Sequence, residues 1–437
     1  MAQPLNTEEK KEIAVLVGVR LGHHMQDGLN LDDSLAELEL LADTAGLEVV
    51  GTLTQNLESP NTKTYLGSGK VEELKLLMGE LTANVVIFDD ELSPRHQREL
   101  EEELGDGIKV IDRTALILDI FAQHASTREG MLQVELAQLK YRLPRLTRAW
   151  THLARQAGGA SGRSGGAGGV GLRGPGEQQL EIDRREIRIN IKHLEEALEK
   201  VRENRSRQRD QRRKTNIPVV ALVGYTNAGK STLLNRLTDA AIYVADQLFA
   251  TLDPTTRQLE LPTGQEILLT DTVGFIQKLP TQLVAAFRAT LEEICEANLL
   301  VHVVDISHPN AENQRRSVLE TLELIGAVNI PTLTVYNKTD LINRPELDEL
   351  IKEHHPGTLH ISSLTGEGIP KLLQVISTEI LKDFRHIDAL IPYTEGQLIS
   401  MFHEKGKVES IENLENGIRV RGLVPIQLEA YFKAYLK

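Results

Sequence analysis

The chain has 437 residues, 41% of them hydrophobic and 26% charged. This composition excludes wholesale disorder and collagen-like repeats, and it predicts two to four domains at roughly 100–200 residues each. The net charge of −14 excludes a protein that coats nucleic acid with its whole surface, but not one with a local basic patch. The single cysteine, Cys295, excludes an intramolecular disulfide and a Cys-rich zinc module. Because no apolar run reaches the ~18 residues of a membrane span and no signal peptide is evident, we expect a cytoplasmic protein.

The first segment, residues 1–127, alternates short Val- and Ile-rich runs with stretches of helical apolar spacing. The runs predict strands at 13–19, 49–55, 85–88 and 109–111, and the spacing predicts helices at 31–45, 70–80 and 94–104. Strand–helix alternation with short connections is typical of a parallel sheet covered by helices. We therefore expect an N-terminal α/β domain.

The second segment, residues 128–214, carries two heptad seams, one from Leu132 to Leu153 and one from Leu180 to Val201. They predict an antiparallel helical hairpin, and Pro144 should kink its first helix. Ten of the nineteen residues in the connecting loop, 158–176, are glycine. Such a loop is usually a flexible linker, but its place between two helices that should pair favours a segment that becomes ordered on a partner.

Positive charge is concentrated in this hairpin. From Lys140 to Lys214 there are 19 Lys and Arg against 9 Asp and Glu, a local charge of 19 − 9 = +10, so the remainder carries −14 − 10 = −24. A charged run is often only a solvated helix face, but a segregated basic arm on an acidic protein is better explained by contacts with nucleic-acid phosphates. RNA or DNA is the expected partner.

The third segment, residues 215–382, contains a glycine-rich phosphate-binding motif between an apolar strand and an amphipathic helix. The motif GxxxxGKS predicts binding of a nucleoside triphosphate through backbone N–H groups, the helix N-terminus, a lysine that reaches the β and γ phosphates and a serine hydroxyl on Mg²⁺. Its residues are Gly224, Tyr225, Thr226, Asn227, Ala228, Gly229, Lys230 and Ser231. Because an apolar strand precedes the motif and an amphipathic helix follows it, a chance glycine turn is improbable.

Three further motifs follow, each at a predicted strand end. The run Asp271-Thr272-Val273-Gly274 places a carboxylate near Mg²⁺ and a glycine N–H near the γ-phosphate. In Asn337-Lys338-Thr339-Asp340, the Asp340 carboxylate can accept hydrogen bonds from two adjacent N–H donors, which guanine has and adenine lacks. Small residues in Ser362-Ser363-Leu364 can bond the guanine carbonyl through their backbone. Four motifs in this order predict a guanine nucleotide site.

A threonine between Ser231 and Asp271 should close over the γ-phosphate and complete the Mg²⁺ shell, and Thr251, Thr255 and Thr256 are all candidates. Phe275, which follows Gly274, cannot hydrogen-bond the attacking water, whereas many regulatory GTPases have glutamine there. Intrinsic hydrolysis should therefore be slow unless another group positions the water. Asn227 is one candidate, either directly or through a monovalent cation such as K⁺; the alternative is that Asn227 only forms the turn.

The last segment, residues 383–437, predicts a strand at 390–393, a helix around 395–403, strands at 408–413 and 418–424, and a final helix that runs to Leu436. We expect a small α+β domain. The whole chain is thus predicted to be a multidomain α/β protein: an N-terminal α/β domain, a helical hairpin, a GTPase domain with a mostly parallel sheet, and a C-terminal α+β domain.

The sequence resembles the HflX family of ribosome-associated GTPases. The resemblance covers nearly the whole chain and is carried by SPNTKTYLGSGKVEEL, the glycine-rich hairpin, GYTNAGKS, FATLDPTTR, DTVGF and NKTD. It implies that the N-terminal domain and hairpin bind the large ribosomal subunit and its rRNA. It also implies that the first switch is Phe249, Ala250, Thr251, Leu252 and Asp253, with Thr251 as the Mg²⁺-linked threonine beside Ser231.

Combining residues and resemblance, we expect a Mg²⁺-dependent GTP hydrolase with Lys230, Thr251, Gly274 and Asn227 as catalytic residues. It should bind GTP and GDP, be a monomer when free, and split stalled or idle ribosomes under stress. One alternative is a GTP-gated RNA-remodelling or ribosome-assembly factor. Another, of a different class, is a GTP-regulated scaffold for protein partners.

Overall fold

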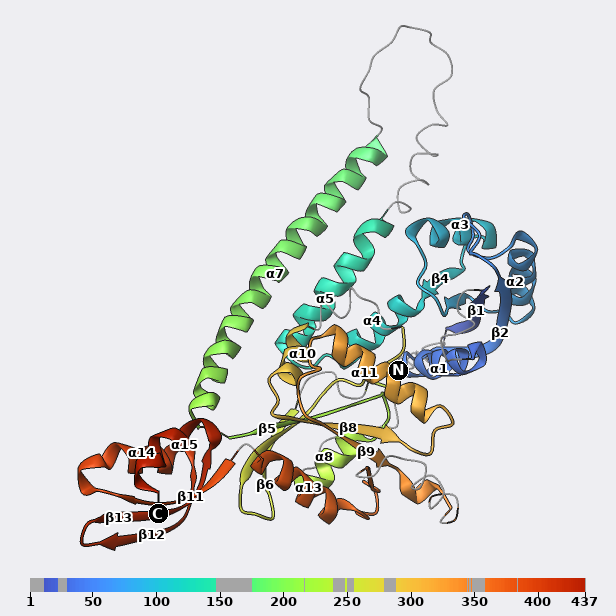
Figure 1. Cartoon of the computed structure of the whole chain (residues 1–437). Coiled ribbons are helices and arrows are strands. Elements are labelled where there is room, and N and C mark those ends of the chain that lie inside the picture. Colours follow the sequence, from blue (N-terminus) through green and yellow to red (C-terminus); the bar gives the residue numbers. More distant parts are fainter. Residues whose placement is uncertain are drawn as a thin grey trace, which may run out of the picture. The chain divides into compact units, whose positions relative to one another are not determined.

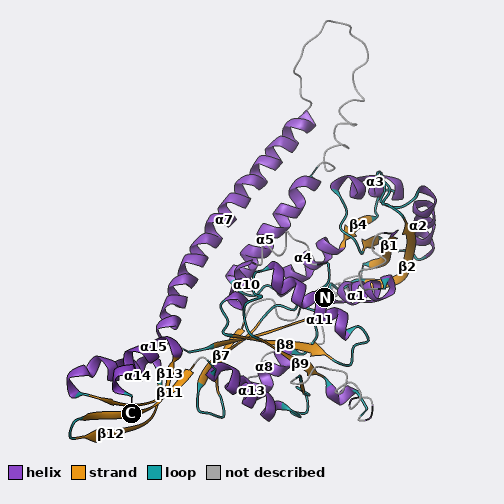
Figure 2. Ribbon diagram, in the orientation of Figure 1, coloured by secondary structure: helices purple, strands orange, loops and turns teal. Residues whose placement is uncertain are grey.

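A computed structural model of the whole chain describes residues 12–22, 30–146, 175–215, 217–238, 248–249, 255–278, 288–343, 345, 347, 358–382 and 384–436. The chain divides into two compact units. The first comprises Met1–Glu199 with the short segments Gln247–Phe249 and Lys278–Phe287, and the second comprises Lys200–Asp246, Ala250–Gln277 and Arg288–Lys437. Figure 1 traces their elements along the chain and Figure 2 shows the mixture of helices and strands.

The first unit contains a four-stranded parallel sheet of order β2-β1-β3-β4. Its strands are β1 (Ile13–Leu21), β2 (Glu48–Leu57), β3 (Val85–Phe88) and β4 (Lys109–Asp112), and its helices are α1 (Leu31–Thr44), α2 (Ser68–Glu80), α3 (Pro94–Leu104) and α4 (Arg113–His124). The sheet strands carry fully buried Val, Leu, Ile and Phe side chains, among them Leu16, Val86, Ile87 and Phe88, as expected of strands covered on both faces. The predicted strands and the three predicted helices match to within two residues, whereas α4 was not predicted.

Two helices of the predicted hairpin follow. Helix α5 (Arg128–Arg142) ends in a short 3₁₀ turn, η2 (Leu143–Arg145), at the point where Pro144 was expected to disturb it. Helix α7 (Pro175–Thr215) is 41 residues long and begins in the first unit and ends in the second. Lys140 Nζ of α5 lies 2.7 Å from Glu195 Oε1 of α7. The loop from 158 to 174, with Arg163 and Arg173, lies outside the described residues.

The second unit contains a six-stranded sheet of order β10-β9-β8-β5-β7-β6 in which all pairs are parallel except β6 with β7. The strands are β5 (Val219–Gly224), β6 (Thr255–Glu260), β7 (Glu266–Asp271), β8 (Leu299–Asp305), β9 (Thr332–Asn337) and β10 (Leu359–His360). Its helices are α8 (Lys230–Thr238), α10 (Arg288–Cys295), α11 (Ala311–Leu324) and α13 (Ile369–Leu381), with the 3₁₀ turn η4 (Thr339–Leu341). All four predicted motifs follow the carboxyl ends of β5, β7, β9 and β10, the usual ligand edge of such a sheet.

The C-terminal part is a three-stranded antiparallel sheet, β11-β13-β12. Strands β11 (Phe384–Ile391), β12 (Lys407–Leu414) and β13 (Gly417–Pro425) are covered by α14 (Gly396–Lys405) and α15 (Ile426–Phe432), with Phe402 and Phe432 fully buried against each other. The four-domain division proposed above stays a prediction, and each of the three sheets falls inside one predicted domain. In the described part of the chain, no helix is both long and apolar enough to cross a membrane.

Candidate guanine nucleotide site

The phosphate-binding motif forms the turn between β5 and α8. Gly229 has a φ of +91°, and a Cβ there would lie 2.3 Å from Asn337 Nδ2. A Cβ on Gly224 would lie 2.3 Å from the carbonyl oxygen of Val303 on β8. Both positions therefore require glycine, because any side chain would force this loop away from the neighbouring strands. The turn opens at the N-terminus of α8, where backbone N–H groups attract phosphate.

Lys230, the first residue of α8, is buried, and its Nζ donates to the carbonyl oxygens of Gly224 at 3.1 Å and Tyr225 at 2.8 Å. Burial lowers the pKa of Lys230 to about 8, while the Asp271 carboxylate opposes that shift. A buried ammonium group on a loop of carbonyl oxygens is poorly compensated. Phosphate oxygens at this position would stabilise its charge.

Ser231, which was predicted to bind Mg²⁺, pairs with Asp271, which was predicted to lie near that ion. Ser231 Oγ donates to Asp271 Oδ2 at 2.6 Å, and Asp271 is 1% exposed at the end of β7. A hydroxyl and a carboxylate are oxygen ligands of the type that Mg²⁺ prefers beside phosphates. The residues present fit this ion, which would be held by Ser231 directly and by Asp271 through its hydration shell. No cluster of three or more His, Cys, Asp or Glu side chains suited to a metal occurs in the described part of the chain.

The segment after Asp271 lies directly against the phosphate loop. Phe275 N–H donates to Gly224 O at 3.1 Å, and Thr226 N–H donates to Phe275 O at 2.8 Å. A Cβ on Gly274 would lie 2.8 Å from Thr226 Cα and Cγ2 and 3.1 Å from Lys230 Nζ. Gly274 therefore sits at the part of the loop that faces Lys230, and only glycine fits there. The Phe275 side chain is 2% exposed, and a buried phenyl ring offers no hydrogen bond to water.

The base-recognition loop is held by Asn337, which is 1% exposed at the end of β9. Asn337 Nδ2 donates to Ala228 O at 2.9 Å, and its Oδ1 accepts from Ser363 N–H at 2.9 Å. One side chain thus joins the phosphate loop to the Ser362–Leu364 loop. Lys338 adopts a left-handed conformation, with φ +64°, and its Nζ pairs with Asp305 Oδ2 at 2.7 Å.

Asp340 is exposed, and its Oδ1 accepts a hydrogen bond from Ser362 Oγ. The hydroxyl orients the carboxylate while the group stays accessible, which suits recognition of two adjacent N–H donors. Ser362 and Ser363 are buried, whereas the Leu364 side chain is 72% exposed. The structure thus brings together the predicted residues of the phosphate loop, the DxxG segment and both base loops. Their nucleotide contacts stay predictions.

The first switch is only partly described. Ala250, Thr251, Leu252 and Asp253 lie outside the described residues, so the choice of Thr251 stays a prediction. Thr255 and Thr256 begin β6, and the Thr256 hydroxyl lies 3.0 Å from that of Thr270. Phe249 belongs to the first unit, where its buried ring contacts Phe121 of α4 edge to face at 4.6 Å.

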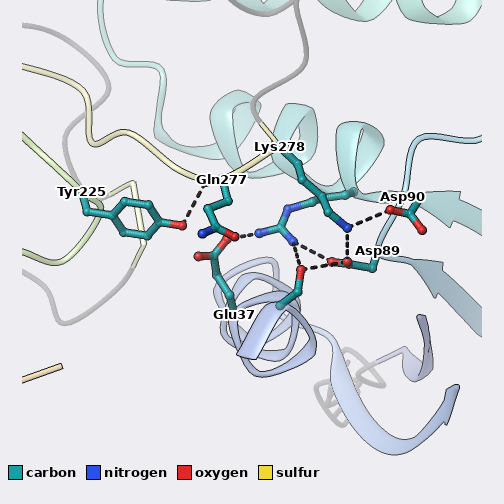
Figure 3. Close-up of polar contacts among 8 residues, drawn as sticks. Glu37, Asp89, Asp90, Tyr225, Gln277 and Lys278 are labelled. Atoms are coloured by element: carbon teal, nitrogen blue, oxygen red, sulfur yellow. Dashed lines mark hydrogen bonds and ion pairs between the residues drawn. The ribbon is translucent and has the colours of Figure 1, made fainter. Parts of the chain in front are cut away.

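The segment that follows Gly274 continues into a charge network that the sequence did not predict (Figure 3). Gln277 N–H donates to the Tyr225 hydroxyl at 2.9 Å within the second unit. The next residue, Lys278, belongs to the first unit, where its Nζ pairs with Asp89, and with Asp90 Oδ1 at 2.7 Å. Neighbouring carboxylates at the end of a buried strand were the only available sequence signal for this cluster.

Asp89 lies deep in the first unit and is paired there with Arg113 as well. Arg113 Nη1 donates to Asp89 Oδ1 at 2.6 Å, and its Nη2 pairs with Glu37. Ser34 Oγ donates to Asp89 Oδ2 at 2.8 Å. Burial raises the pKa of Asp89, while Lys278 and Ser34 act in the opposite direction.

Known proteins resemble this chain over most of its length. Family models match along most of the chain: a GTP-binding GTPase N-terminal region at residues 32–122, a GTP-binding GTPase middle region at 124–212 and a 50S ribosome-binding GTPase at 219–338. A GTPase HflX of Caldanaerobacter subterraneus is 46% identical, covering 98% of this chain and 94% of its own. A GTPase HflX of Escherichia coli is 45% identical over 88% of each chain. The crystal structure of an SsGBP–GDP complex aligns at 26% identity and a TM-score of 0.45, covering 84% of this chain and 98% of its own.

Proposed function

Because the chain belongs to the HflX family of GTPases, we propose that it binds the large ribosomal subunit in its GTP state and splits idle or stalled ribosomes under stress. The protein is a GTPase, converting GTP and water to GDP and phosphate. The observation that carries the ribosomal part of the proposal is that relatives and family models match the hairpin as well as the GTPase domain. Such a protein would act in the cytoplasm, as a monomer when free.

In this proposal the chain's own residues bind and orient the nucleotide. Lys230 and the loop N–H groups hold the β and γ phosphates, and Gly274 N–H bonds the γ-phosphate. Asp340 accepts from the guanine N–H donors, with the Ser362–Leu364 loop at the guanine carbonyl. Ser231 and Thr251 would bind Mg²⁺, which supplies neutralisation of phosphate charge when bound. Loss of the γ-phosphate releases Gly274 and the first switch.

The hairpin supplies the proposed ribosome contact. The hairpin carries a local charge of +10 although the whole chain is acidic. Each lysine or arginine that displaces counterions from rRNA adds to the affinity for the ribosome, and this part of the affinity is sensitive to salt. The side chains of Lys140 and Glu195 join its two helices, so the glycine-rich loop would be presented at the end of a paired stalk. Ribosome association should accordingly weaken steeply as salt is raised.

Sedimentation of intact ribosomes through sucrose gradients tests the proposal. With GTP or a non-hydrolysable analogue, the protein should convert intact ribosomes into free subunits, whereas with GDP it should not. A variant with Arg163→Ala and Arg173→Ala keeps the loop's length and its glycines, so it isolates the contribution of charge, and a deletion of residues 158–176 removes the loop itself.

Each outcome separates the alternatives. Binding without release of subunits would contradict splitting and favour the RNA-remodelling or assembly factor. Ribosome binding that is unchanged by the deletion would contradict a role for the loop and favour the scaffold.

A further inference from the structure

One side chain of the phosphate loop has no explanation in the fold. Thr226 is 6% exposed, and its hydroxyl has no hydrogen-bond partner among the described residues. Neighbouring hydroxyls differ: Thr272 Oγ1 donates to Leu222 O at 2.7 Å, and Ser231 Oγ donates to Asp271. A buried hydroxyl that is left unpaired destabilises the folded state. Valine has the same shape and would avoid this penalty, so stability does not account for threonine at this position.

The location of Thr226 indicates what its hydroxyl can meet. The Thr226 backbone N–H is already used by Phe275 O. Its Cγ2 lies 2.8 Å from the point where a Cβ of Gly274 would stand, and Lys230 Nζ lies 3.1 Å from the same point. The Thr226 hydroxyl and this methyl group are attached to the same Cβ atom. The hydroxyl therefore lies close to Gly274 and to Lys230 Nζ as well. Lys230 and Gly274 are the groups expected at the γ-phosphate, and Thr226 therefore lies at the γ end of the loop.

Hydrolysis requires a group that positions water at this end. The oxygen of water attacks the γ-phosphorus, the bond to the β–γ bridging oxygen breaks with its electron pair leaving on GDP, and the water proton passes to a phosphate oxygen. Phe275 cannot orient that water. A threonine hydroxyl both donates and accepts, so it can accept from the water while it donates to a γ-phosphate oxygen.

We propose that Thr226 is a catalytic residue of the GTPase reaction, and that its hydroxyl positions the attacking water on the γ-phosphate. The hydroxyl is not consumed and does not change its protonation state. This role is distinct from nucleotide affinity, because the phosphates are already held by Lys230 and the loop N–H groups. It is also distinct from a cation site at Asn227, because it requires no monovalent ion.

Three variants test the role: Thr226→Val removes the hydroxyl and keeps the shape, Thr226→Ser keeps the hydroxyl, and Thr238→Val is the matched control. The Thr238 hydroxyl donates to Leu234 O within α8, outside the site. In single-turnover hydrolysis without ribosomes, Thr226→Val should be slower by about 100-fold, the cost typical of losing one transition-state hydrogen bond. Thr226→Ser and Thr238→Val should stay within about fivefold of the wild type.

Two further measurements separate catalysis from structure. The affinity of Thr226→Val for GDP, which has no γ-phosphate, should stay within about threefold of the wild type. Its affinity for a non-hydrolysable GTP analogue should fall by no more than about tenfold, the cost of one hydrogen bond to the γ-phosphate. The thermal unfolding midpoint of the nucleotide-free variant should be equal to or above that of the wild type, because an unpaired buried hydroxyl has been removed. The rate defect should be the same in potassium and in sodium.

Normal hydrolysis by Thr226→Val would overturn the proposal. A Thr226→Ser variant as slow as Thr226→Val would also overturn the proposal, because a hydroxyl at this position would then not restore the rate. A lowered unfolding midpoint together with weakened GDP binding would make Thr226 a structural residue. A defect confined to potassium would move the missing catalytic group to a cation at Asn227.

Discussion

His302 should make the GTPase domain acid-sensitive. It lies in the middle of β8, 0% exposed, and its register partners are Val223 of β5 and Thr334 of β9. Neither ring nitrogen has a hydrogen-bond partner among the described residues. Burial, together with the nearby charges of Arg315 and Lys230, lowers the pKa of His302 to about 3. We predict that His302→Leu makes this domain more resistant to acid.

The sign and size of the effect follow from proton linkage. In the unfolded chain the histidine has its ordinary pKa of 6.5, so as pH falls the unfolded state binds the proton first. The contribution of His302 to the free energy of unfolding is therefore fully present above pH 6.5 and is lost as pH falls toward 3. At pH 5 the loss spans about 1.5 pH units at about 1.4 kcal/mol each, or about 2 kcal/mol. Any folded pKa below about 4 gives nearly the same figure.

Calorimetry of the full chain at pH 7.5 and pH 5 measures the effect, because the transition that GDP shifts upward belongs to the nucleotide-binding domain. The unfolding midpoint of the wild type should drop between pH 7.5 and pH 5, and in His302→Leu this drop should be smaller by about 4–8 °C. That difference corresponds to about 2 kcal/mol in a domain of this size. Comparing the two pH values cancels packing changes that are independent of pH. His308→Leu, at an exposed position of the same domain, should behave as the wild type. Equal pH dependence in His302→Leu and the wild type would refute the reasoning.

Three other predictions concern the site and its surroundings. Asp340→Asn should weaken guanine nucleotide binding about 10–150-fold and shift preference toward xanthine nucleotides; unchanged GDP affinity in titration would contradict the base assignment. The pKa of Lys230 is lowered to about 8 in the nucleotide-free protein, and bound phosphates should raise it. GDP binding is then accompanied by uptake of a proton at pH values above about 8. The affinity for GDP should therefore fall about fourfold between pH 7 and 8.5. Lys230→Arg stays charged and should abolish that dependence, so a persisting fall would exclude Lys230 as its source. Arg113→Met should destabilise the first unit by about 3–5 kcal/mol, because it removes the buried one of the two cationic partners of Asp89. Lys278→Met should cost below about 1 kcal/mol, since that side chain is 43% exposed. Equal losses in urea unfolding would refute this ranking.

Local patterns predicted most elements of the first unit and, in the second, the strands that carry the motifs; the strand predicted at 390–393 is β11, which begins earlier, at Phe384, and ends at Ile391. Strands β1 to β4 and helices α1 to α3 were identified because apolar side chains recur with the period of each element. Helix α4 was missed because its sequence, RTALILDIFAQH, is apolar nearly all round, with Thr114, Leu116, Ile117, Leu118, Ile120 and Phe121 all buried. A helix buried on most of its surface shows no contrast between faces, so its period cannot be read.

The nucleotide motifs were readable because phosphate chemistry requires particular residues at short, fixed spacing. The contacts around these motifs could not be predicted from the sequence. Asp89 and Lys278 are 189 positions apart, and Arg113 pairs with Glu37 across 76 positions. Long-range pairings of this kind depend on the tertiary fold, and any acidic side chain could have been the partner. Thr226 was read only as one residue of the loop, because the lack of a partner for its hydroxyl appears only once the neighbouring groups are placed.

The division of the chain has a consequence for dissecting the protein. The peptides Gln247–Phe249 and Lys278–Phe287 lie within the sequence of the GTPase domain but belong to the first unit. Cutting out residues 215–382 would therefore remove the partners of both peptides. The Phe249 ring, now 3% exposed against Phe121, would lose that partner and face water. Exposing a phenylalanine costs about 1.5–3 kcal/mol and leaves an apolar side chain on the surface at the start of the predicted first switch. Kinetics measured on such a fragment would describe a GTPase domain without these contacts, and they should not be equated with the rate of the intact protein.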